Sequence, residues 1–153
     1  MKLYIEDLLR EINILNWYRG EAAKRVDVSA DLVQSGSDQQ DALLSHIRSA
    51  VTDILLFANS NRVKFTCEVT DDALNFSLEP LREGREYMKD ILREAIRQYI
   101  VYEVRRLWMM MMRPEWADAS IREELRQNIK SAMSAVTAGG ERIRRRPTDL
   151  AGI

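Results

Sequence analysis

The sequence predicts a mainly helical protein: a helical bundle with one long helix at about residues 81–112, one inserted β-hairpin at about residues 62–79, and an extended C-terminal tail. Two observations carry this prediction. Apolar residues recur every three or four positions in most of the chain, whereas strict alternation of apolar and polar residues is confined to one stretch. We expect residues 1–138 to form a single domain and residues 139–153 to form the tail.

Two helices are expected before the hairpin. The first covers residues 4–15, and Gly20 is expected to interrupt the helical structure after it. Residues 25–40 are polar and indicate a loop, which is long enough to suggest contact with another molecule. The second helix covers about residues 38–58, with Ser37 or Asp38 as its N-cap. The apolar positions of the two helices are Ile5, Leu8, Leu9, Ile12 and Leu15, then Leu43, Leu44, Ile47, Val51, Ile54, Leu55 and Ala58.

The clearest strand signal follows the second helix. Apolar residues alternate with polar residues from Val63 to Val69 and again from Leu74 to Leu78, on either side of an acidic turn. This period of two indicates a β-hairpin with one buried face. Because a hairpin alone is marginally stable, we expect it to pack on helices or to join another sheet, and both edges could accept a further strand.

The longest helical pattern covers residues 81–112 and stops at the Arg-Pro pair that begins at residue 113. Such a helix would be ~45 Å long, which exceeds the width of a small domain. A last helix is expected from Ile121 to Val136, with Asp118 or Ser120 as its N-cap.

The end of the long helix reads Trp-Met-Met-Met-Met. Five consecutive large apolar residues span more than one turn, so this end is apolar on every side, unlike a half-exposed helix with one apolar stripe. Either the chain's own helices cover it or a neighbouring subunit does, since Trp and Met are enriched in interface cores. The candidate subunit interface consists of Trp108, Met109, Met110, Met111, Met112 and Trp116.

Composition bounds the class of protein. Hydrophobic residues make up 46% and charged residues 31%, which is typical of an ordered globular chain. The single cysteine, Cys67, excludes an intramolecular disulfide and a cysteine-based metal site, and it fits a reducing compartment. No apolar run is long enough to cross a bilayer, and Glu6 and Asp7 stand where a signal peptide would be apolar. We therefore expect a soluble protein that is made in a cytoplasm and has no membrane partner.

No catalytic motif is evident. His46 has no recognisably placed partners, and Cys67 falls on the apolar side of the hairpin, so both are expected to be ordinary structural residues. The pairs Asp71-Asp72 and Glu123-Glu124 are typical of a turn and of a helix surface. The chain lacks a glycine-rich phosphate loop. We expect no catalytic, cofactor-binding or metal-binding residues and no enzymatic activity.

The tail after Gly139-Gly140 is rich in arginine. Clustered cations suit a nucleic acid or an acidic protein surface, although a solvated tail would have the same composition. A DNA-binding domain is normally basic as a whole, whereas this chain has a net charge of -1, so we favour docking on a protein. The predicted docking residues are Arg142, Ile143, Arg144, Arg145, Arg146 and Leu150.

The order helix, loop, helix, hairpin, long helix and short helix, followed by a tail, resembles the head–tail connector (adaptor or neck) proteins of tailed bacteriophages. More narrowly, residues 81–112, the Arg-Pro-Glu-Trp turn and residues 121–136 look like small phage structural proteins from Bacteroides-type hosts. The likeness lies in the order of elements and covers about residues 1–136.

The resemblance implies a non-enzymatic virion structural protein that is assembled in the host cytoplasm. Such proteins form rings, commonly dodecamers, that bind beneath the portal protein and join it to the tail or to other neck proteins. Family members often send a C-terminal segment onto the portal, a role that Glu141–Ile153 would take here, and its arginines leave contact with DNA in the channel open. Two alternatives remain. One is a small nucleic-acid-binding or regulatory helical protein that uses Arg142–Arg146, and the other is a helical adaptor in a bacterial complex unrelated to phages.

Overall fold

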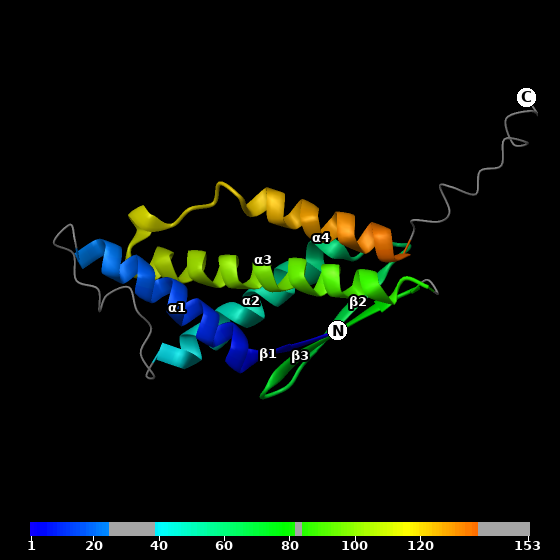
Figure 1. Ribbon diagram of the computed structural model, residues 1–153, viewed down its shortest axis with the longest axis horizontal. Coiled ribbons are helices and arrows are strands. Elements are labelled where there is room, and N and C mark those ends of the chain that lie inside the picture. The colour runs from blue at the N-terminus through cyan, green and yellow to red at the C-terminus, as the bar shows by residue number, and fades with distance from the viewer. Residues whose placement is uncertain (25–38, 82–83, 138–153) are drawn as a thin grey trace, which may run out of the picture.

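A computed structural model describes residues 1–24, 39–81 and 84–137 (Figure 1). This part of the chain is mainly helical with a small antiparallel sheet, so the predicted fold class is confirmed. The elements in chain order are β1 (Lys2–Tyr4), α1 (Ile5–Lys24), α2 (Gln40–Ala58), β2 (Lys64–Val69), β3 (Ala73–Glu79), α3 (Glu86–Met112), the short 3-10 helix η3 (Pro114–Trp116) and α4 (Arg122–Thr137).

Helix α3 lies along the long axis of the molecule and packs against α1, α2 and α4 (Figure 1). Helices α2 and α4 run against its direction, and the sheet lies near the end at which α3 begins. Four apolar side chains at intervals of four residues place the core along α3, and all are fully buried: Leu92, Ile96, Ile100 and Val104. Burial of each such side chain contributes about 1.5–3 kcal/mol, so this stripe stabilises the packing of the other helices on α3.

The sheet confirms the predicted hairpin. β3 is the central strand, with β1 on one side and β2 on the other, and both pairings are antiparallel. Lys64 pairs with Glu79 at the open end of the hairpin. On the buried face, the rings of Phe65 and Phe76 stack with their centroids 5.4 Å apart. Because one ring is on β2 and the other on β3, the stack joins the two strands and adds to the stability that burial of the rings gives.

Strand β1 corrects the prediction for the N-terminus, where residue 4 was assigned to the first helix. Leu3 pairs with Leu74 and is buried in the core, and the Met1 amino group donates to the Phe76 carbonyl at 2.7 Å. Three residues are too few to show a period of two, and their partner lies far along the chain. The hairpin therefore does join a further strand, on one of its two edges.

Two helix boundaries also differ from the prediction. Helix α1 continues through Gly20 to Lys24, so the predicted break there is wrong. A glycine inside a helix costs only about 1 kcal/mol, which a helix of 20 residues tolerates. Helix α3 begins at Glu86 rather than at residue 81, because Gly84 has a φ of 77°, in the left-handed region that a right-handed helix excludes. With 27 residues, α3 is ~40 Å long.

Two predictions fall on residues that the structure does not describe. The expected loop at residues 25–40, with the N-cap at Ser37 or Asp38, lies almost wholly outside the described residues. The tail at residues 139–153 lies outside them as well.

Candidate functional site

The Trp-Met block at the end of α3 is divided between core and surface. Trp108 and Met109 are buried within the chain's own fold, with 1% and 4% of their surface exposed. Met112 is partly buried and packs against the core. Met110 and Met111 are 50% and 60% exposed. The chain's own elements therefore cover one part of the block, and the other part is apolar surface.

Both exposed methionines have a polar neighbour at sulfur. Arg106 Nη1 donates to Met110 Sδ at 3.0 Å, and His46 Nε2 lies 3.2 Å from Met111 Sδ. Since His46 belongs to α2, the second contact joins the start of α2 to the end of α3. Burial lowers the pKa of His46, which favours its neutral form. The sulfur contacts hold the side chains while leaving much of their apolar surface open to another molecule.

A groove of about 280 Å³ runs between this part of α3 and the segment that leads to α4. It is lined by Tyr102, Arg105, Arg106, Met109, Trp116, Asp118 and Ile121. The Tyr102 hydroxyl donates to the Asp118 carbonyl oxygen, which ties the segment to α3. The Arg113 guanidinium lies over the Trp116 ring, 5.7 Å from its centroid. The lining of the groove therefore mixes apolar side chains with charged ones.

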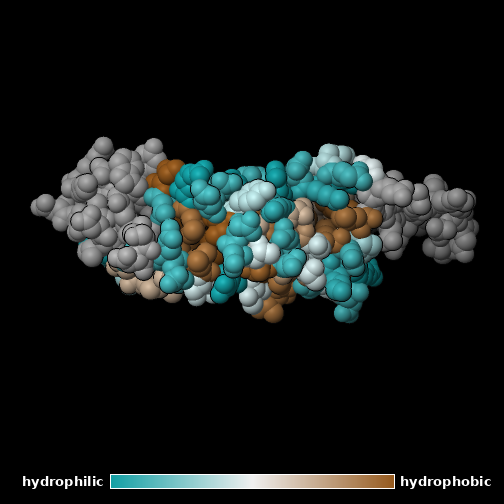
Figure 2. All heavy atoms as spheres, turned by 90° about the horizontal axis from the view of Figure 1, so that it is seen from below, coloured by the Kyte–Doolittle hydropathy of each residue, from teal (hydrophilic) through white to brown (hydrophobic). Residues whose placement is uncertain are grey.

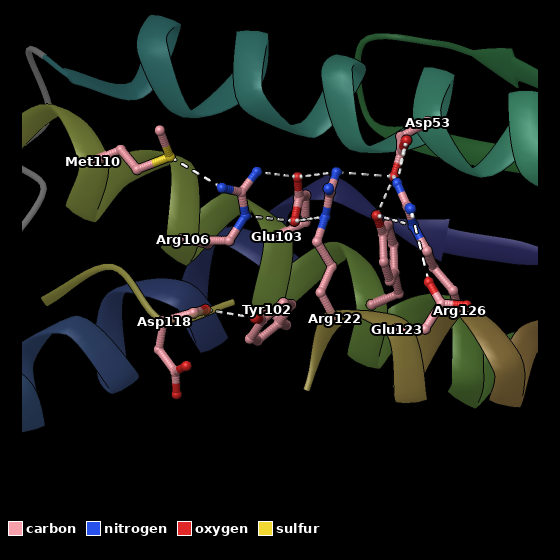
Figure 3. A network of polar contacts seen from close by, with 10 residues as sticks. Asp53, Tyr102, Glu103, Arg106, Met110, Asp118, Arg122, Glu123 and Arg126 are labelled. Atoms are coloured by element: carbon pink, nitrogen blue, oxygen red, sulfur yellow. Dashed lines mark hydrogen bonds and ion pairs between the residues drawn. The ribbon is translucent and has the colours of Figure 1, made fainter. Parts of the chain in front are cut away.

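A polar network joins α2, α3 and α4 (Figure 3). Glu103 is 3% exposed and accepts hydrogen bonds from Arg106 at 2.6 Å and from Arg122 at 3.0 Å. Asp53 of α2 accepts from Arg126 at 2.8 Å. Arg122 also lies 3.4 Å from Asp53, so it links the two carboxylates. Every charge in the network therefore has a partner on another turn or another helix.

The network lowers the pKa of both acids. Burial by itself would raise the pKa of Asp53 and of Glu103, but hydrogen bonds and charges from the surrounding arginines outweigh it. Tyr99, whose hydroxyl donates to Asp53, shows the converse: burial and this hydrogen bond raise its pKa to about 12. At neutral pH, the carboxylates are ionised and the tyrosine is protonated.

This arrangement suits a structural role. A general acid or base works best with a pKa near the operating pH, whereas Asp53, Glu103 and Tyr99 have theirs shifted away from it. Their oxygens are occupied by arginine side chains of neighbouring helices. The network therefore positions α4 on α2 and α3, and it holds one wall of the groove in place.

The other predicted residues lie in separate places. Trp116 is partly buried in η3 and lines the groove. Cys67 is half-buried on β2, and burial raises its pKa to about 11. The tail residues lie outside the described residues, so docking through them stays a prediction: Arg142, Ile143, Arg144, Arg145, Arg146 and Leu150.

Sequence reasoning missed the polar network. It did not connect Arg106 with Glu103. A signal was present, because Glu103 and Arg106 are three residues apart on one helix and Arg122 and Arg126 are four apart on another. Asp53 gave no such signal, since its partners lie on a helix far along the chain.

Within residues 1–24, 39–81 and 84–137, no three His, Cys, Asp or Glu side chains gather to hold a metal ion. In the same part of the chain, no helix combines the length and the apolar character needed to cross a membrane. No protein-family model, curated protein sequence or solved structure matches the chain. Function is therefore inferred from the fold and its surfaces.

Proposed function

We propose that the chain is a non-enzymatic virion structural protein, a subunit of the ring that joins the portal of a tailed bacteriophage to its tail. The observation that carries this proposal is the apolar end of α3, where the side chains of Met110 and Met111 are exposed and the preceding residue, Met109, lines the groove. The order of elements from β2 to α4 supports it: a hairpin, a long helix, a proline turn and a short helix, as in the proteins that the sequence resembles.

In the proposed ring, the exposed methionines of one subunit pack on the next subunit. Met adapts to irregular partner surfaces, and arginines such as Arg106 are common at the polar rim of interfaces. A closed ring also needs a second, different patch on each subunit. Figure 2 shows a face on which hydrophobic side chains reach the surface along the long axis, and exposed apolar residues at the start of α3 include Tyr87 and Ile91.

The tail has the second part of the proposed role. Residues 141–153 would dock on an adjacent virion protein, such as the portal or another neck protein, through their arginines and Leu150. Deletion of residues 141–153 is expected to yield heads and tails that do not join. Particles with normal heads and normally joined tails would contradict the docking role.

Ring formation is tested with Met111→Lys in the full chain. We expect rings of the unaltered chain in negative-stain images and in native mass spectrometry, and mainly monomers of the variant, because a charge cannot be buried in the contact without a partner. Leu56→Lys is the matched control, since Leu56 is 77% exposed near the opposite end of α2 from His46. Rings of Met111→Lys in normal yield, or a monodisperse monomer of the unaltered chain at high concentration, would contradict the proposal.

One observation favours a second candidate function. Four arginines lie between residues 142 and 146, a density typical of segments that contact nucleic acid. Under this alternative the chain is a small nucleic-acid-binding or regulatory protein. DNA binding by the isolated protein that weakens steeply with salt would favour it.

A further inference from the structure

Two sets of contacts fix which backbone groups of β2 point away from the rest of the sheet. Successive peptides along a strand point to opposite sides. The Phe65 N–H donates to Asn59 Oδ1 at 2.7 Å, and the Phe65 carbonyl accepts from Asn59 Nδ2 at 2.9 Å. The Thr70 N–H instead donates to a carbonyl of β3 at 2.9 Å. Cys67 and Val69 therefore turn their N–H and C=O groups outward, on the same side as Phe65.

The same alternation gives β1 an outward edge on the other side of the sheet. The Met1 amino group donates to the Phe76 carbonyl and the Phe76 N–H donates to the Met1 carbonyl, both at 2.7 Å, so Met1 faces β3. Lys2 and Tyr4 lie at the alternate positions and face away from β3. Because α1 begins at Ile5, the Tyr4 carbonyl accepts the first bond of that helix. The open groups of β1 are therefore the N–H and C=O of Lys2 and the N–H of Tyr4.

Neither edge is occupied within the part of the chain that the structure describes. There, no hydrogen bond from another element uses the outward groups of Lys2, Cys67 or Val69. A hollow of about 210 Å³ lies beside β1, and Lys2 and Tyr4 contribute to its lining. Open strand edges of this kind are where a further strand adds to a sheet.

The two edges carry opposite charges on their exposed faces. Lys2 is exposed on β1, and its Nζ lies 4.8 Å from the centroid of the Tyr4 ring. Glu68 is exposed on β2, between Cys67 and Val69. Neither Lys2 nor Glu68 forms an ion pair with the residues that the structure describes. Each edge therefore lacks a counter-ion that the other edge could supply.

Two β2 strands do not suit each other. Antiparallel pairing of Cys67 in one copy with Val69 in another would place the two Glu68 carboxylates directly opposite each other, which is destabilising. Pairing centred on Cys67 would need the Phe65 peptide, which Asn59 occupies. The complement of β2 is therefore a different edge with a basic side chain.

We propose that β2 of one copy of the chain pairs with β1 of the next copy as a parallel strand. Both strands are antiparallel to β3, so they run in the same direction within one sheet. Copies related by a rotation thus present β1 and β2 to each other in parallel, as a head-to-tail contact in a ring requires. The pairing rests on the proposed ring, and it would join the small sheets of neighbouring subunits into one.

The open groups match when Lys2 lies opposite Glu68. A residue in a parallel pair bonds with the two residues that flank the one opposite it. The Lys2 N–H would donate to the Cys67 carbonyl, and the Lys2 carbonyl would accept from the Val69 N–H. The Tyr4 N–H would donate to the Val69 carbonyl. All three bonds use groups that are open in the single chain, and the buried faces of the two sheets lie on the same side.

Other registers of this pair use fewer open groups. A shift of two residues that sets Lys2 against Thr66 would need the Phe65 carbonyl, which Asn59 occupies. A shift of two residues in the other direction would leave Cys67 unused and would pair β1 with the turn of the hairpin. The charge pair and the backbone bonds therefore select the same register.

Charge reversal in the full chain tests the pairing. Lys2→Glu would set a carboxylate against Glu68, and Glu68→Lys would set an ammonium group against Lys2. Each variant alone is expected to need a concentration about tenfold higher than the unaltered chain for assembly, measured by native mass spectrometry. An equimolar mixture is expected to regain assembly, with the two masses in equal number. The reason is that every contact in an alternating ring then joins opposite charges.

Two more variants separate strand pairing from a general effect of charge. Val69→Pro removes the outward N–H group without loss of a bond inside the chain, and it is expected to raise the assembly concentration at least about tenfold. Arg62→Glu reverses an exposed charge just before β2, outside the paired residues, and is expected to leave assembly unchanged. Circular dichroism checks that each variant is folded.

The outcomes distinguish this pairing from the proposed ring itself. Rings of the unaltered chain together with unchanged assembly of Val69→Pro and of both charge variants would overturn the pairing and leave the ring in place. Loss of assembly in both charge variants without recovery in their mixture would also overturn it. A monodisperse monomer of the unaltered chain at high concentration would overturn the pairing and the ring together.

Discussion

Replacing Glu103 by Gln removes the charge that two arginines share while it keeps the shape of the side chain. The Arg106 and Arg122 side chains are 15% and 31% exposed, so water restores only part of what they lose. Loss of one partner from a buried ion pair costs about 3–5 kcal/mol. Because Arg122 is partly solvated and keeps Asp53 at 3.4 Å, we expect the free energy of unfolding to fall by about 2–3 kcal/mol.

Urea unfolding followed by far-UV circular dichroism measures this loss. Glu94→Gln is the matched control, because Glu94 pairs with Arg97 on the same helix but the two side chains are 50% and 30% exposed. Such a surface pair contributes at most about 1 kcal/mol. For a chain of this size, we expect the melting temperature of Glu103→Gln to fall by about 4–12 °C. A Glu103→Gln loss no larger than that of Glu94→Gln would refute the view that the network holds α4 in place.

Three further predictions concern acid, the core and the sheet edge. Folding lowers the pKa values of Asp53 and Glu103, so their contribution to stability is complete above their unfolded-state pKa values and is lost as the pH falls below about 4. Thermal melts over a pH series check this, and the loss of stability in acid should be smaller in Glu103→Gln. In the same urea assay, Trp108→Ala is expected to lower the free energy of unfolding by about 3–5 kcal/mol, and Met111→Ala by less than about 1 kcal/mol. Equal losses would contradict the division of the Trp-Met block into a buried part and an exposed part. Asn59→Ala removes two hydrogen bonds to Phe65 at the edge of β2, so it is expected to lower the free energy of unfolding by about 1–2 kcal/mol. It is also expected to speed aggregation in light-scattering measurements, and unchanged aggregation would show that Asn59 does not protect the edge.

The sequence predicts those parts of the fold whose cause is local. The alternation between Val63 and Leu78 and the four-residue spacing along α3 are properties of adjacent residues, and both elements form as expected. Strand β1 could not be predicted in this way, because its three residues are stabilised by pairing with β3 rather than by their own pattern. The predicted start of α3 is too early, since the spacing of apolar residues does not reveal that Gly84 has a left-handed conformation.

The same distinction applies to the candidate site. The run of apolar residues located the surface, but it could not say which methionines are exposed, because that depends on which elements surround the helix. The network around Glu103 combines side chains from α3 and α4, and the sequence shows only the pairs that lie on one helix. The predicted docking tail and the predicted subunit contact stay predictions.

Burial of Trp108 fixes the direction of each methionine in the block, and the elements around the end of α3 then decide which of them are exposed. Successive residues on a helix are separated by about 100°, so once Trp108 faces the core the directions of Met110 and Met111 are fixed as well. Their sulfur contacts with Arg106 and His46 then restrict the two side chains before any partner binds. Side chains that are already restricted lose less conformational entropy on association. The apolar run at the end of α3 thus supplies both the anchor of the helix and a preorganised surface, and a change at the anchor should weaken association as well as folding.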